Sequence, residues 1–134
     1  MTVLDAGVLI AVMGRSDVRD TAARIAIAAA VREDEVVFPA STCAEILVLR
    51  SRLGGEATPH RDDLIDTLPA RIESVSRQIA AAAAGFRAQR SWRLKLADAL
   101  VIATPQVVTA DRILATDRGW SDIGMAVPLV AGKS

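Results

Sequence analysis

The first eleven residues (MTVLDAGVLIA) place one carboxylate, Asp5, inside an otherwise apolar run. An ionised carboxylate without a partner is costly to remove from water, so such an acid belongs at the end of an element or at a site that uses its charge. Residues 2–4 are short and apolar, as in a buried strand, and Gly7 supplies a permissive backbone where that strand turns into a helix. We therefore expect Asp5 at the carboxyl end of a central parallel strand, the edge of an open α/β sheet where ligands bind.

Short apolar segments alternate along the chain with stretches of helical spacing. The predicted strands are residues 2–4, 36–38, 70–75, 113–115 and 126–130. The predicted helices are 8–13, 18–32, a segment capped by Ser41 or Thr42 and ending near Leu53, 60–68, 77–91, and 94–108 with Pro105 kinking or ending it. This alternation predicts an α/β fold, a three-layer α/β/α sandwich with a mainly parallel, roughly five-stranded sheet. The 134 residues contain no repeat or low-complexity linker, so we expect a single domain over residues 1–134.

Composition excludes several classes of protein. Sixteen acidic residues balance sixteen basic ones, so net charge does not indicate a nucleic-acid binder, and four aromatic residues are too few for a base-stacking platform. The single cysteine, Cys43, excludes an internal disulfide and a cysteine-based zinc cluster. No apolar run approaches the roughly 20 residues of a membrane helix, and no basic region precedes the first apolar stretch. We expect a cytoplasmic protein without a membrane span, in which oxygen ligands hold any metal.

Four acids fall in related positions. Asp5 and Asp117 follow predicted strands, whereas Glu45 and Asp98 lie near the starts of predicted helices. In a parallel sheet these positions share one edge, and four carboxylates gathered there would need a cation or raised pKa values. Magnesium takes oxygen ligands and supports phosphodiester hydrolysis. Taken singly, Glu45 and Asp98 suit a structural role in a first helical turn better than a catalytic one, and Asp117 also suits a plain turn.

Four segments resemble the successive motifs of PIN-domain proteins, and among these the small VapC toxins of bacterial toxin–antitoxin pairs: LDAGVLI (4–10), STCAEIL (41–47), LADALVIAT (96–104) and ADRILATD (110–117). The resemblance implies an α/β/α sandwich and a magnesium- or manganese-dependent endoribonuclease that uses metal-activated water. It implies that Asp5, Glu45, Asp98 and Asp117 are the catalytic acids that hold Mg²⁺ or Mn²⁺, with Thr116 as a hydroxyl neighbour. It also implies an RNA substrate, a homodimer, and a VapB-type antitoxin that covers the acidic cleft.

The sequence departs from the family pattern at a few positions. Gly7 stands where many members have Ser or Thr, and Pro105 and Thr109 stand where the family usually continues a helix and then turns at glycine. Asp111 is expected to start a strand or to pair with an arginine. Asp122 remains a candidate peripheral ligand.

Two other functions compete with the ribonuclease. The first is a catalytically inert PIN-like module that binds RNA or protein, which the hydroxyl missing at Gly7 keeps open. The second is an α/β phosphatase or phosphotransferase with Asp5 as the nucleophile, but Gly7 stands where such an enzyme needs a second aspartate. The basic residues that could line an RNA path, or could be solvated surface, are Arg50, Arg52, Arg87, Arg90, Arg93 and Lys95.

Overall fold

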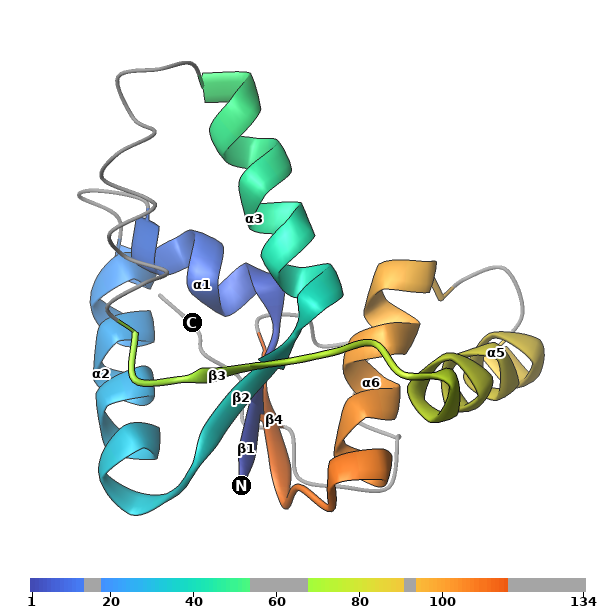
Figure 1. Ribbon diagram of the computed structural model, residues 1–134. Coiled ribbons are helices and arrows are strands. Elements are labelled where there is room, and N and C mark those ends of the chain that lie inside the picture. Colours follow the sequence, from blue (N-terminus) through green and yellow to red (C-terminus); the bar gives the residue numbers. More distant parts are fainter. Residues whose placement is uncertain (14–17, 54–67, 91–93, 116–134) are drawn as a thin grey trace.

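The computed structural model describes residues 1–13, 18–53, 68–90 and 94–115 (Figure 1). Its elements are β1 (Thr2–Leu4), α1 (Ala6–Met13), α2 (Val18–Glu33), β2 (Val36–Pro39), α3 (Ala40–Leu53), β3 (Arg71–Glu73), α5 (Arg77–Arg90), α6 (Leu96–Val108) and β4 (Arg112–Leu114). The four strands form one parallel sheet in the order β3-β2-β1-β4, which places β1 between β2 and β4. The predicted α/β fold with a parallel sheet is confirmed. The strand predicted at 126–130 and nearly all of the helix predicted at 60–68 lie outside the described residues.

Alternation along the strands divides the core into two apolar layers. Leu4 and Phe38 pack with residues of α1, α2 and α3, whereas Val3, Val37 and Ile113 pack with α5 and α6. Figure 1 shows the same arrangement, with α1 and α2 on one side of the strands and α5 and α6 on the other. Both faces of the sheet are therefore covered, as its near-continuous apolar strands require. None of the helices within the described ranges is long and apolar enough to cross a membrane.

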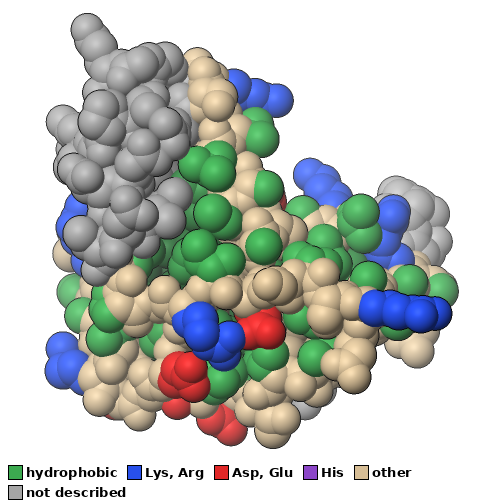
Figure 2. All heavy atoms as spheres, viewed as in Figure 1, with side chains coloured by type: hydrophobic (Ala, Val, Ile, Leu, Met, Phe, Trp, Pro, Cys, Tyr) green, Lys and Arg blue, Asp and Glu red, His purple; other side chains and the backbone are tan. Residues whose placement is uncertain are grey.

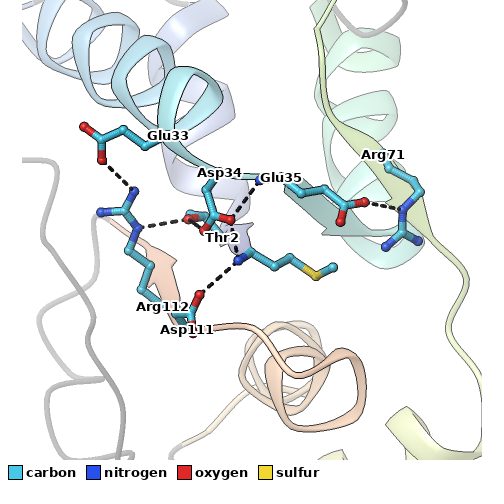
Figure 3. A network of polar contacts seen from close by, with 8 residues as sticks. Thr2, Glu33, Asp34, Glu35, Arg71, Asp111 and Arg112 are labelled. Atoms are coloured by element: carbon cyan, nitrogen blue, oxygen red, sulfur yellow. Dashed lines mark hydrogen bonds and ion pairs between the residues drawn. The ribbon is translucent and has the colours of Figure 1, made fainter.

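A network of polar contacts joins the strands at the edge where they begin (Figure 3). Arg112 Nε donates to the hydroxyl of Thr2 at 2.9 Å, and that hydroxyl donates to Asp34 at 3.1 Å. Arg71 Nε of β3 donates at 3.3 Å to Glu35, the residue before β2. Thr2 is fully buried, so these bonds satisfy a hydroxyl that has no access to water. The network therefore supports the register of β1 against its neighbours at the edge opposite Asp5.

Asp111 belongs to this opposite edge. Its N–H donates to the carbonyl oxygen of Met1 at 2.9 Å, and its carboxylate accepts a hydrogen bond from the Met1 α-ammonium at 3.0 Å. Asp111 precedes β4, as expected, but its partner is an amino group and not an arginine. At about 3.3 Å per strand residue, the four residues from Met1 to Asp5 span roughly 13 Å. Asp111 therefore lies too far along the sheet to share a ligand with Asp5.

The start of α3 differs from the prediction, and Pro105 does not end α6. Helix α3 begins at Ala40, directly after β2, so Ser41 and Thr42 lie inside its first turn and the prediction that either caps the helix was wrong. Pro39, the last residue of β2, therefore stands directly before the helix, and its side chain has no hydrogen-bonding group with which to cap it. Helix α6 continues for three residues past Pro105 and ends at Val108, so the proline does not end it.

The left-handed backbone of Thr109 (φ 59°) closes α6 and generates a stability prediction. A β-branched residue is strained in this conformation by about 1–2 kcal/mol, whereas glycine adopts it freely but loses about 0.5–1 kcal/mol of chain entropy. We expect Thr109→Gly to raise the free energy of unfolding by about 0.5–1 kcal/mol, measured by chemical denaturation. Thr109→Ala keeps a Cβ atom and should gain less. A glycine variant less stable than wild type would contradict the strain at this position.

Candidate active site

Asp5 occupies the junction between β1 and α1. Its N–H donates to the carbonyl oxygen of Leu114 in β4 at 3.0 Å, and only 7% of the residue is exposed. Its carboxylate accepts hydrogen bonds from the N–H groups of Ala6 and Gly7, in the first turn of α1, and these bonds favour the charged form. Burial has the larger opposite effect, and together with the negative charges of Asp98 and Glu45 it raises the pKa of Asp5 to about 6. Two backbone N–H groups thus fix the position of the Asp5 carboxylate, but they do not offset the cost of its negative charge.

Glu45 and Asp98 reach the same region from two other helices. Glu45 lies in α3, and its pKa is raised by burial and by the negative charge of Asp98. Asp98 lies in the first turn of α6. Because the charge of Asp98 acts on both Asp5 and Glu45, the structure brings three of the four predicted acids together from β1, α3 and α6.

The fourth predicted acid, Asp117, lies outside the described residues, as do Thr116 and Asp122. The described residues that precede Asp117 in the sequence give only the position of β4. Leu114 pairs with Leu4, so β4 ends beside the strand end that carries Asp5. The predicted role of Asp117 stays a prediction.

The donor chemistry of the site fits a hard divalent cation. Its three acids offer only oxygen, and a cation would offset the burial and the repulsion that together raise the pKa values of Asp5 and Glu45. Two buried hydroxyls in the first turn of α3, Ser41 Oγ and Thr42 Oγ1, also lack a hydrogen-bond partner. Within the described ranges, no three His, Cys, Asp or Glu side chains are close enough to hold one ion. Asp5, Glu45 and Asp98 therefore form a coupled acidic site and not a closed ligand cage.

Sequence reasoning named Lys95 among six bases that could line an RNA path, but it did not place this residue beside the acids. Lys95, immediately before α6, lowers the pKa of Glu45 through its positive charge. The only sequence signal was its spacing, because a residue three positions before Asp98 can lie on the same side of a helix start. Its spacing alone did not separate it from the other basic residues.

The raised pKa of Asp5 makes the stability of the metal-free protein depend on pH. The carboxyl group of Asp5 binds its proton more tightly in the folded protein than in the unfolded chain. Its contribution to the free energy of unfolding is therefore fully present below about pH 4 and is lost as the pH rises through about 6. At about 1.36 kcal/mol per pKa unit, the pKa shift corresponds to a loss on the order of 3 kcal/mol when Asp5 is ionised. Because asparagine carries no charge, Asp5→Asn should be more stable than wild type by this amount in EDTA at neutral pH. Urea denaturation should show this difference vanish near pH 4. An equal difference at both pH values would mean that the charge of Asp5 is not its cause.

Comparisons with known proteins agree with this fold. The solved structures that it resembles include a toxin–antitoxin complex from Klebsiella pneumoniae, at 20% identity and a TM-score of 0.76 over 96% of this chain and 97% of that chain. VapBC2 from Rickettsia felis, bound to a DNA fragment from its promoter, gives 10% identity and a TM-score of 0.78 over 96% and 97%. Mycobacterium tuberculosis VapC20, a sarcin–ricin loop cleaving toxin, gives 18% identity and a TM-score of 0.74 over 94% and 97%.

At these identities the solved structures establish similarity of fold alone. A search of curated protein sequences finds no match. The family model of the PIN domain, however, matches residues 2–125, a span that contains all four predicted acids. The chain therefore belongs to the PIN-domain family.

Proposed function

We propose that this chain is the VapC-type toxin of a type II toxin–antitoxin pair, a metal-dependent endoribonuclease that hydrolyses RNA phosphodiester bonds. The observation that carries the proposal is the electrostatic coupling of Asp5, Glu45 and Asp98 at the carboxyl edge of a parallel sheet with the PIN fold. An uncompensated buried carboxylate destabilises a fold, so its presence is best explained by a ligand that carries positive charge. The VapC20 toxin with the same fold, a sarcin–ricin loop cleaving protein, supports RNA as the substrate.

The residues of the site would divide the work according to their surroundings. Asp5, Glu45 and Asp98 would hold Mg²⁺ or Mn²⁺ partly through bound water, since they are not close enough to enclose an ion themselves. Asp117 would complete the set. The bound ion supplies a more acidic water and stabilises charge on the scissile phosphate. No side chain of the protein then needs to act as a nucleophile. The three carboxylates would fix where the ion and the phosphate lie relative to each other.

The proposed partner is a cognate VapB-type antitoxin. Structures with this fold include a toxin–antitoxin complex and a VapBC assembly, which supports such a pairing here. A basic segment of the antitoxin would complement the charge of Asp5, Glu45 and Asp98 and compete with the metal ion. This arrangement would block the site without changing the fold.

A homodimer is also part of the proposal. Leu47 and Val48 of α3 and Ile72 of β3 are large apolar side chains with more than a third of their surface exposed. Figure 2 shows apolar side chains reaching the surface along α3, above a region over β3 where acidic and basic side chains adjoin. Exposed apolar residues of this kind support a contact between subunits.

Asp98→Asn tests the ribonuclease directly. Removing partners that only orient metal ligands costs about 10- to 100-fold in activity, so loss of a ligand itself should lower cleavage by at least about 100-fold. We expect a labelled structured RNA pool to be cut by the wild type with Mg²⁺ or Mn²⁺, not with EDTA, and not detectably by Asp98→Asn.

Asp111→Asn is the matched control for that measurement. It makes the same chemical change at an exposed acid on the opposite edge of the sheet, so it should cut RNA at the wild-type rate. Wild-type cleavage by Asp98→Asn would refute the assigned site. Metal binding by the wild type without any RNA turnover would instead favour the catalytically inert binding module.

A further inference from the structure

Lys95 lies immediately before α6, the helix that carries Asp98, on a backbone that the structure holds in place. It is the last residue before α6, with an extended backbone (φ −68°, ψ 152°). Its carbonyl oxygen accepts a hydrogen bond from Ala99 N–H at 2.9 Å, and the carbonyl of the preceding Leu94 accepts one from Arg87 Nε of α5 at 2.9 Å. Leu94 is itself only 6% exposed. Contacts to both α5 and α6 therefore fix the point from which the lysine side chain extends.

The positive charge of Lys95 acts on the acidic site without forming an ion pair among the described residues. Its side chain is exposed, and its positive charge acts on Glu45 of α3. Within the described part of the chain, its ammonium forms no hydrogen bond or ion pair with another side chain. Lysine in such a setting is a mobile point charge that a phosphate oxygen can bind.

The acidic site itself creates a need for such a group. Asp5, Glu45 and Asp98 concentrate negative charge where an RNA backbone, also negative, would have to approach. A bound cation offsets this repulsion at the scissile phosphate, which it contacts, but it makes no contact with the phosphates on either side. A basic side chain beside the acids is suited to bind a phosphate next to the scissile one.

We propose that Lys95 binds an RNA phosphate adjacent to the scissile bond and so positions the strand over the acidic site. This inference rests on the proposed ribonuclease function. Arg87 contributes as a positioning residue, because its bond to the Leu94 carbonyl holds the backbone that precedes the lysine.

The test compares cleavage kinetics of wild type, Lys95→Met, Lys95→Arg and Arg32→Met at saturating Mn²⁺ and several salt concentrations. Methionine keeps an unbranched apolar side chain without the charge. For Lys95→Met we expect KM for RNA to rise about three- to tenfold with kcat within about twofold. The slope of log(kcat/KM) against log[salt] should become shallower by about 0.7, the value for one phosphate contact to a single strand.

The other two variants are controls. Lys95→Arg keeps the charge and should preserve most of the salt slope. Arg32→Met also removes an exposed base, from the last turn of α2, which leads into the start of β2 at the opposite edge of the sheet, and should leave KM and slope unchanged.

The outcomes separate this inference from the ribonuclease proposal. If the wild type cuts RNA and Lys95→Met keeps the wild-type KM and salt slope, or loses only kcat or thermal stability, the phosphate-binding role is wrong. If the wild type cuts no RNA, the proposed function fails. Fluorescence anisotropy of the same RNA then decides the role of Lys95, because weaker binding with a shallower slope in Lys95→Met supports it and unchanged binding overturns it.

Discussion

The burial of one carboxylate, Asp5, at the end of the inner strand β1 is the constraint on which the functional part of this structure depends. The sheet requires β1 to be apolar and covered on both faces, so the acid that follows it is carried out of water. Backbone N–H groups of Ala6 and Gly7 hold its carboxylate in place, but Asp98 and Glu45 add like charge from α6 and α3. The resulting negative potential is what makes this edge suited to a cation and its phosphate.

The two edges of the sheet handle charge in opposite ways. At the edge where the strands begin, Arg112 and Arg71 meet Thr2 and Glu35, and the contacts join strands that lie far apart in sequence (Figure 3). Exposed ion pairs of this kind add little stability individually, but here they connect strands of the sheet at its amino-terminal edge. At the edge where the strands end, acids face acids. Among the described residues the fold pairs opposite charges at one edge and gathers like charges at the other, and the second edge is where we propose that the cation binds.

Much of this could be predicted from the sequence, because apolar strands and helical spacing are local signals. The strand before Asp5 and the helix that carries Asp98 were found this way. The start of α3 was not found, because Ser41 and Thr42 are residue types that commonly cap helices. Nothing in the local sequence shows that the helix begins directly after Pro39. Nor could spacing distinguish Lys95 from the other bases, because that depends on how α6 packs against α5 and α3. The role of Asp117 remains a prediction.

Calorimetric titration of Mn²⁺ into the metal-free protein is the most direct test that three carboxylates form one cation site. The variants are Asp5→Asn, Glu45→Gln and Asp98→Asn, with Asp111→Asn as the exposed control. The account predicts binding to the wild type and to Asp111→Asn with the same affinity, and at least about tenfold weaker binding to each of the other three. Wild-type affinity in those three variants, or no binding by the wild type, would contradict it.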